Sequence, residues 1–162
     1  MHINKIQLKE IDTDSYEVIL NKAGRVVDGI NHGRMVLKGD GVYYKIFDKE
    51  YCRRENFVKA LEAGFFDEVA PALQSLIVDG DDIVGYVTEA GEELGLVWAD
   101  SLVREPFYQK LLACVDVTKM FFYDLVPANI ITTKSGELSL IDLESVYNID
   151  ELYTIDKHNA KV

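Results

Sequence analysis

Short segments in which apolar and polar residues alternate fill most of the first half of the chain. Such segments are typical of strands, because successive side chains of a strand point to opposite faces of a sheet. Two of them, residues 34–37 and 42–47, flank residues 38–41, in which two glycines and an aspartate favour a turn. We therefore predict a β-hairpin here, preceded by strands at residues 16–20 and 25–27.

After this hairpin the apolar period changes from two residues to about 3.6, which indicates a helix. We predict it from about residue 49 to residue 66, with Gly64 as a weak point and Pro71 as a stop to any continuation. The apolar positions that form one helical stripe are Phe57, Val58, Leu61, Phe65 and Phe66. Residues 76–78 and 83–88, separated by an acidic turn, predict a second hairpin.

The second half of the chain opens with another helical stripe. It predicts a helix from about residue 104 to residue 119, with Pro106 in the first turn, where proline is well tolerated. Further on, residues 130–132 and 138–141 predict a short hairpin, and the final 20 residues show little periodicity. Strands and helices in this order predict an α+β fold.

Composition and charge narrow the classes of function. The 162 residues suffice for one domain or for two small lobes that share one site. With 28 acidic and 17 basic residues, the net charge is −11. A negative surface repels phosphate backbones, so we expect no nucleic-acid partner. A local anion site built from backbone N–H groups and one or two cations remains compatible with this charge.

Several features bear on the compartment. No run of 18 apolar residues is present, so we expect no membrane span, and the N-terminal residues have no signal-peptide core. Cys52 and Cys114 are far apart and form no CxxC motif, which favours reduced thiols in a cytoplasmic protein. His2, His32 and His158 lie in unrelated segments and give no support to a zinc site.

Three polar residues occur where the local pattern predicts burial. Lys45 lies inside an apolar strand, Asp124 follows three aromatic residues, and Asp142 ends the strand predicted at 138–141. Each alone has an ordinary explanation as a solvent-facing or turn residue. Together they are more informative: Asp124 and Asn129 frame Asp-Leu-x-x-x-Asn, and an Ile-Asp-Leu-Glu sequence containing Asp142 follows.

This set resembles the catalytic core of the protein-kinase-like superfamily, in which a loop carries an aspartate and an asparagine and a hairpin then delivers a metal-binding aspartate. Arg54-Glu55 and residues 69–71 look more like the aminoglycoside phosphotransferase and choline kinase branch than like eukaryotic protein kinases. The resemblance implies an antiparallel β-sheet N-lobe with one helix over residues 1–90, and an abbreviated helical C-lobe over residues 91–162.

The same resemblance implies ATP and Mg²⁺ as cofactors and a role for each matching residue. Lys45 would contact a phosphate and be held in place by Glu55. Asp124 would accept or orient the proton of the attacking hydroxyl. Asn129 and Asp142 would supply oxygen ligands to Mg²⁺, which prefers carboxylate, amide and water oxygens.

Further positions follow from the resemblance. The abbreviated phosphate loop, in which missing Cβ atoms let the backbone approach the nucleotide, would contain Gly29, Asn31, His32 and Gly33. Glu62 is a second candidate partner for Lys45, since seven residues bring it back to almost the same helical face as Glu55. Glu144 replaces the family's usual glycine, and the sequence leaves open whether it lies near the metal or faces water.

Four functional hypotheses follow. The first is a minimal phosphotransferase that binds nucleotide and transfers phosphate to a hydroxyl of an unidentified small-molecule or protein acceptor. Because only about 20 residues follow Asp142, the second is a catalytically silent kinase-like binding module, and a homodimer could complete the short lobe. The third is a metal-dependent α+β hydrolase that uses Asp124, Asp142 and Glu144. The fourth is a small acidic interaction domain.

Overall fold

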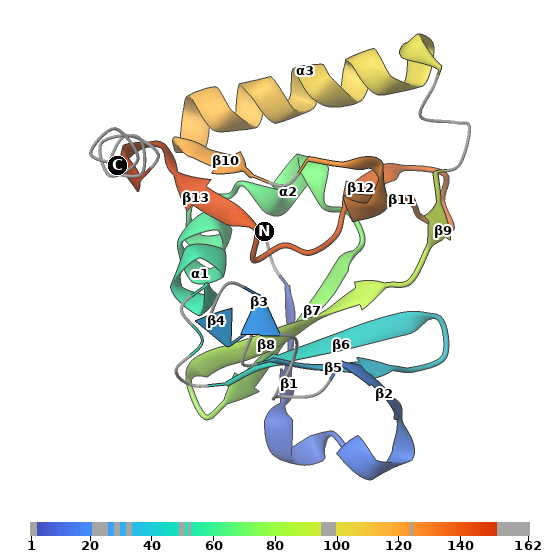
Figure 1. Ribbon diagram of the computed structural model, residues 1–162, viewed down its shortest axis with the longest axis vertical. Coiled ribbons are helices and arrows are strands. Elements are labelled where there is room, and N and C mark those ends of the chain that lie inside the picture. The colour runs from blue at the N-terminus through green and yellow to red at the C-terminus, as the bar shows by residue number, and fades with distance from the viewer. Residues whose placement is uncertain are drawn as a thin grey trace.

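The computed structural model describes residues 3–20, 26–27, 30–31, 34–48, 51, 53–94, 100–123 and 125–151. In this part of the chain, six strands form the main sheet, in the order β1-β7-β8-β6-β5-β2 (Figure 1). All neighbours in the sheet are antiparallel except β1 and β7, which are parallel. The strands are β1 (Asn4–Gln7), β2 (Glu17–Leu20), β5 (Arg34–Lys38), β6 (Val42–Phe47), β7 (Leu73–Asp79) and β8 (Asp82–Glu89).

The predicted hairpins form the centre of this sheet. β5 and β6 pair in antiparallel register, and Gly41 takes a left-handed φ of 70° in the turn between them. β7 and β8 form the second predicted hairpin, with Gly80 at a φ of 63° in its turn. The strand β1 was not predicted, because its parallel pairing with β7 joins segments about 70 residues apart and has no local signal.

The helix predicted over residues 49–66 is shorter and divided. It begins at Arg54, ends at Glu62, and is followed by α2 (Phe66–Val69). Gly64 takes a φ of 78°, its N–H donates to the carbonyl of Leu61 (3.1 Å), and the next N–H donates to the carbonyl of Ala60 (3.0 Å). This Schellman arrangement ends α1 (Arg54–Glu62), because only glycine adopts that φ without strain.

A second group of elements lies above the sheet in the view of Figure 1. α3 (Ser101–Thr118) is capped by Asp100, whose carboxylate accepts from the N–H of Leu102. Because the helix starts three residues earlier than predicted, Pro106 lies in its second turn and not in its first. Short strands and turns complete this part: β9 (Glu92–Glu93), β10 (Met120–Phe122), η4 (Pro127–Asn129), β11 (Ile130–Thr132), β12 (Leu138–Leu140) and β13 (Val146–Asn148).

These short strands form two small sheets. β12, β11 and β9 pair in that order, and β10 pairs with β13, both in antiparallel register. The remaining described elements are two short 3₁₀ helices and a two-strand ladder, namely η1 (Leu8–Glu10), η2 (Thr13–Ser15), β3 (Val26–Val27) and β4 (Ile30–Asn31). These helices and sheets together confirm the predicted α+β fold class. No helix among the described residues is long and apolar enough to cross a membrane.

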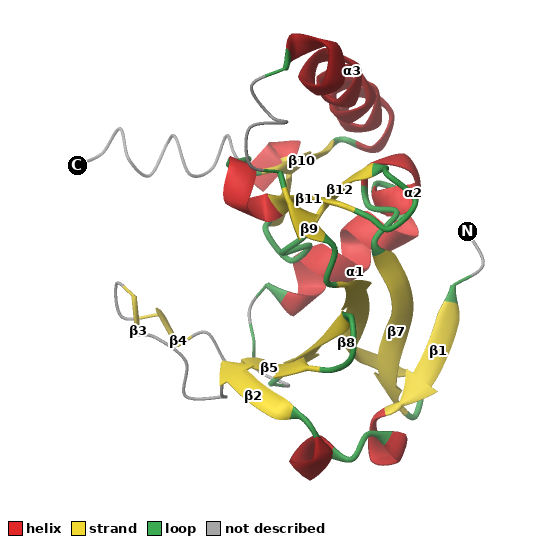
Figure 2. Ribbon diagram, turned by 90° about the vertical axis from the view of Figure 1, so that its right-hand side faces the viewer, coloured by secondary structure: helices red, strands yellow, loops and turns green. Residues whose placement is uncertain are grey.

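One hydrophobic core joins the main sheet to the second group of elements. α1 lies between them, and α2 lies beside β12 and below α3 (Figure 2). Buried residues of the sheet, both helices, α3 and the small sheets belong to a single cluster. At its centre, the ring of Phe57 stacks on the ring of Tyr86 with 4.7 Å between centroids. A second, smaller hydrophobic cluster contains Leu37, Ile77 and Val87. It lies on the side of the sheet where η1 and η2 are found.

Gly85 allows β8 to approach β6 closely, and this gives a first prediction. A Cβ atom added at Gly85 would collide with the carbonyl oxygen of Lys45 and lie 3.1 Å from the Cα of Ile46. We expect Gly85→Ala to lower the free energy of unfolding by roughly 3 kcal/mol or more, because the backbones must separate. Urea denaturation followed by circular dichroism measures this loss.

Gly80→Ala is the matched control, since no atom lies within 4 Å of the added Cβ and only the left-handed φ opposes it. It should cost about 1 kcal/mol. Equal losses in the two variants would show that the close approach at Gly85 is not a constraint on the sheet.

Candidate functional site: an ion cluster beside a cleft

The register of the main sheet places three polar side chains on one face. Lys45 in β6 lies opposite Val36 in β5 and opposite Tyr86 in β8. Residues directly opposite one another in a sheet share a face, and so do residues two apart on one strand. Arg34, two residues before Val36, therefore joins Lys45 and Tyr86 on the face that looks toward the second group of elements.

The turn after β12 brings two carboxylates to this face. Asp142 has a left-handed φ of 61°, a conformation that aspartate tolerates better than most residues. The turn is closed by Ser145, whose N–H donates to the carbonyl oxygen of Asp142 (3.0 Å) and whose hydroxyl donates to its Oδ2 (2.9 Å). The chain thereby reverses, and both Asp142 and Glu144 meet the sheet.

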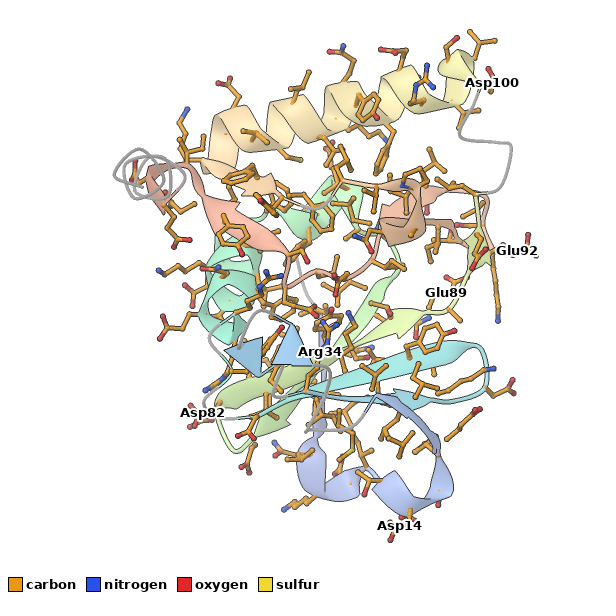
Figure 3. The ribbon with its side chains drawn as sticks, viewed as in Figure 1. Asp14, Arg34, Asp82, Glu89, Glu92 and Asp100 are labelled. Carbon is orange, nitrogen blue, oxygen red and sulfur yellow. The ribbon has the colours of Figure 1, made fainter. Side chains whose placement is uncertain are left out.

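The four charged side chains form one compact cluster. Lys45 Nζ lies 2.6 Å from Asp142 Oδ1 and 3.1 Å from Glu144 Oε1. Arg34 Nη1 lies 3.1 Å from the same Asp142 oxygen and also pairs with Glu144 Oε1. Each cation therefore contacts both carboxylates, and the charges balance. Figure 3 labels Arg34 between the main sheet and the elements above it.

Tyr86 supports the cluster from below. Its hydroxyl donates to Glu144 Oε2 and accepts from the backbone N–H of Leu143 (3.1 Å). Burial, together with the charge of Glu144, raises the pKa of this phenol well above its usual value. The phenol therefore stays protonated at neutral pH and can act as the donor.

The four charged groups differ in their access to solvent. The side chain of Glu144 is fully buried, whereas Lys45, Arg34 and Asp142 retain 15, 20 and 23% exposure. Burial acts to raise the pKa of Asp142, but the charges of Lys45 and Arg34 and hydrogen bonding to the carboxylate outweigh it. They hold this pKa well below its usual range. Asp142 is therefore ionised at neutral pH.

A cleft of about 290 Å³ opens beside the cluster. Its lining combines strand residues with residues of the second group: Ile19, Arg34, Val36, Tyr43, Lys45, Thr88, Asn129, Ile141 and Asp142. The structure thus brings Lys45, Asn129 and Asp142 to one cleft. A backbone hydrogen bond from Ile141 to the carbonyl of Asn129 (2.9 Å) ties the end of η4 to the turn that carries Asp142.

The structure does not place Glu55 or Glu62 beside Lys45. Both are exposed on α1, and Lys45 instead contacts Asp142 and Glu144. The reason is the orientation of the helix, whose buried residues are Phe57 and Ala60. At about 100° per residue, these lie on the opposite side of the helix from the two glutamates.

Other expected site residues have less structural description. Asp124, Gly29, His32 and Gly33 lie outside the described residues. Of Asn31, the structure gives only its place in β4, opposite Val26. Arg34 and Tyr86 were missed by the sequence analysis. Arg34 stood at the start of a strand and Tyr86 inside an apolar one, and neither position signals a contact with a distant turn.

Glu144 does not face water, which was one of the two expectations for it, because its side chain is fully buried beside Asp142. Its two oxygens are taken by Arg34, Lys45 and Tyr86. Within the described ranges, no group of three or more histidine, cysteine, aspartate or glutamate side chains could hold a metal ion. The carboxylate cluster expected for a metal-dependent hydrolase also includes Asp124, which lies outside the described residues, so that hypothesis stays a prediction.

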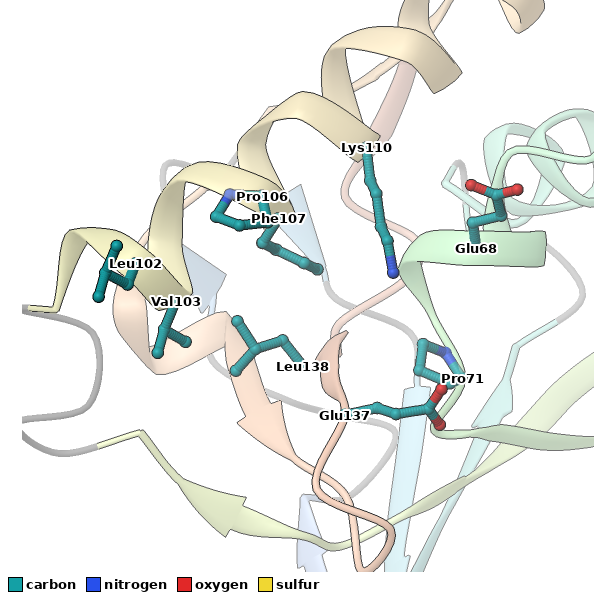
Figure 4. Close-up of a pocket in the computed structure, with 9 residues that line it drawn as sticks. All are labelled: Glu68, Pro71, Leu102, Val103, Pro106, Phe107, Lys110, Glu137 and Leu138. Carbon is teal, nitrogen blue, oxygen red and sulfur yellow. The ribbon is translucent and has the colours of Figure 1, made fainter.

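A second hollow, of about 210 Å³, lies between α2, the first half of α3 and β12 (Figure 4). Its lining is mainly apolar, with Lys110, Glu68 and Glu137 at its edges. It contains no member of the ion cluster and none of the residues expected from the sequence. The cleft beside Lys45 is therefore the candidate functional site.

Comparison with solved structures finds similar chains, and WbdD is one of them. No family model matches the chain, and no curated protein matches it. A 2.2 Å crystal structure of WbdD is similar over 71% of this chain, with 18% sequence identity and a TM-score of 0.43. The chain spans 30% of the WbdD chain. The candidate site is accordingly assigned from the geometry of this chain's own residues.

The lowered pKa of Asp142 predicts how stability depends on pH. In the folded protein its carboxylate stays ionised at pH values well below its unfolded pKa of about 3.9. Its contribution to the free energy of unfolding is therefore complete above about pH 3.9 and is lost as the pH falls below that value. At pH 7, Asp142→Asn should lower the free energy of unfolding by roughly 3 kcal/mol, because Lys45 and Arg34 then face Glu144 alone. The difference from the wild type should narrow below about pH 4.

Urea denaturation at several pH values between about 3 and 7 measures this difference. Asp116→Asn is the matched control, since the Asp116 side chain is 89% exposed on α3. The control should track the wild type at every pH. A difference for Asp142→Asn that stayed constant down to about pH 3 would contradict the ionised, paired state of this carboxylate.

Proposed function

We propose that the cleft beside Lys45 binds the phosphates of ATP together with Mg²⁺, and that the protein is a phosphotransferase of the protein-kinase-like type acting on a hydroxyl acceptor. One observation carries the proposal. Lys45, Asn129 and Asp142 line one cleft, although Lys45 and Asp142 are 97 residues apart in the chain. These are the residues that the sequence motif assigns to phosphate and metal binding.

The arrangement of the elements gives further support. A hairpin precedes and includes the strand that carries Lys45, a helix follows it, and two more antiparallel strands complete the series. The Asp-Leu-x-x-x-Asn segment then leads into the β11–β12 hairpin, and Asp142 follows two residues after the end of β12. This is the order of elements that the resemblance to the protein-kinase-like superfamily implies.

The residues of the cleft fit a metal–nucleotide complex. Lys45 and Arg34 supply two cations for anionic phosphate oxygens. Arg34 Nε is buried and has no hydrogen-bond acceptor within the described part of the chain, so this donor is left unsatisfied beside the cleft. Asn129 and Asp142 supply the amide and carboxylate oxygens that Mg²⁺ prefers. The metal, when bound, would neutralise phosphate charge.

The remaining roles belong to this chain's own groups. Lys45 and Arg34 orient and neutralise the phosphates, which is the main requirement of phosphoryl transfer. Asp124 orients the acceptor hydroxyl and accepts its proton, as the resemblance implies. Asp142 Oδ1 pairs with both Lys45 and Arg34. Each of these cations can pair with a phosphate oxygen instead.

A catalytically silent nucleotide-binding module is the second candidate. One observation favours it: the carboxylate proposed as a metal ligand is already engaged by Lys45 and Arg34. A nucleotide held by the two cations alone would bind without being placed for transfer. Turnover separates the two candidates.

Binding is tested by thermal unfolding. At a concentration about 100 times its dissociation constant, Mg·ATP should stabilise the protein by about 2.7 kcal/mol, which raises the melting temperature of a chain of this size by roughly 5 °C or more. Asn129→Ala and Asp142→Asn should lose most of the shift that depends on Mg²⁺. Asp116→Asn, which is remote from the cleft, should keep the full shift. The absence of any shift at millimolar Mg·ATP would refute the proposed function.

Turnover is tested with radiolabelled ATP and a panel of hydroxyl compounds, with water as the minimal acceptor. We expect phosphate transfer or release that falls by at least about 100-fold in Asp124→Asn, because the residue that takes the hydroxyl proton is removed. A thermal shift without turnover dependent on Asp124 would favour the silent module.

A further inference from the structure

Glu144 is a charged residue in a place where charge is costly. Its side chain has no solvent exposure, and its position two residues after Asp142 brings it under the sheet face that carries Lys45. A buried carboxylate survives only when partners replace the water it has lost. Arg34 and Lys45 supply the charges, and Tyr86 supplies a hydroxyl donor.

The position of Glu144 is fixed by contacts that the cleft does not share. Tyr86 holds it through the hydroxyl, and the same hydroxyl accepts from the N–H of Leu143, which is itself fully buried. The ring of Tyr86 packs against the rings of Phe47 and Phe57, which also contact each other, in the main core. Glu144 is therefore anchored to the core, while Asp142 is partly exposed beside the cleft.

The two carboxylates have different access to a ligand. Asp142 lines the cleft and keeps 23% of its side-chain exposure, whereas Glu144 neither lines the cleft nor reaches solvent. Glu144 can thus influence a ligand only through Lys45 and Arg34. Both cations contact its Oε1, as they also contact Asp142 Oδ1, but of the two carboxylates it is Glu144 that the core holds in place.

We propose that Glu144 is the positioning residue that holds Lys45 and Arg34 at the edge of the cleft, in place of an acidic residue from helix α1. This inference rests on the proposed function, because it assigns the partner of the phosphate-binding cations. The consequence is a site assembled by the turn after β12 and by the sheet register. Assembly of this site requires no movement of α1.

The test uses Glu144→Gln, which keeps the size of the side chain and an oxygen that can accept from Tyr86, but removes the charge. Two cations then share Asp142 alone, and we expect them to separate. In the protein without nucleotide, the ammonium group of Lys45 should give a proton–nitrogen NMR cross-peak in the wild type, because its ion pairs slow proton exchange. That cross-peak should be lost in Glu144→Gln.

In the protein with nucleotide, kcat per nucleotide-binding site should fall at least tenfold in Glu144→Gln, while KM for ATP rises by less than about threefold. Removing the negative charge of Glu144 leaves the attraction between the two cations and the anionic phosphates intact. Only the orientation of the phosphates is impaired. Ser139→Ala is the matched control for lost stability, since this buried hydroxyl accepts from the N–H of Ala72 and contacts no cation. It should lower the melting temperature but keep the cross-peak and kcat per site.

Two results would overturn the inference. One is a Glu144→Gln protein that keeps the Lys45 cross-peak and its turnover. The other is a Ser139→Ala protein that loses both, which would mean that they report general stability. A wild type that binds no nucleotide would instead refute the proposed function, and the NMR comparison would still decide whether Glu144 holds Lys45.

Discussion

The meeting of two cations and two carboxylates between the main sheet and the turn after β12 is the constraint on which the rest of the site depends. Charges removed from water are tolerated only when their partners are placed accurately. Arg34 and Lys45 come from neighbouring strands, whereas Asp142 and Glu144 come from a turn about 100 residues further along the chain. If either side moved, charges would be left buried without a partner. The cluster therefore fixes the position of the turn relative to the sheet.

The hydrophobic core fixes the positions of the side chains in this cluster. Tyr86 has its ring among Phe47 and Phe57 and its hydroxyl on Glu144, so a single residue belongs to both the apolar core and the polar site. Gly85, the preceding residue, lets β8 approach the backbone of β6 at Lys45. Packing errors at these two positions would displace the charged groups directly. Stability and site geometry are for this reason coupled through β8.

Local features of the structure could be predicted from the sequence, and long-range ones could not. The two central hairpins and α3 follow from apolar periodicity and turn residues. Lys45 and Asp142 stand out because they interrupt or end such segments, and Asn129 because of its spacing from Asp124. Gly64 itself was a sequence signal for a weak point in the predicted helix. The Schellman turn that ends α1 there also depends on the burial of Phe65, which the local sequence does not determine. For Glu144 the sequence left open a position near a metal or one that faces water. Its burial is decided by Arg34, Lys45 and Tyr86, which the local sequence around it does not contain.

The overall charge of the chain opposes an anionic ligand, whereas the ion cluster beside the cleft is neutral. The chain carries −11, which opposes the approach of a phosphate-rich molecule at long range. At physiological ionic strength, however, exposed charges more than about 8 Å away are largely screened, while partly buried groups are screened much less. Within that distance the cluster is neutral, and its two cations can turn toward a ligand. Because Mg²⁺, when bound, would also offset two of the negative charges of a nucleotide, an acidic surface and the proposed nucleotide cleft are physically compatible in one small protein.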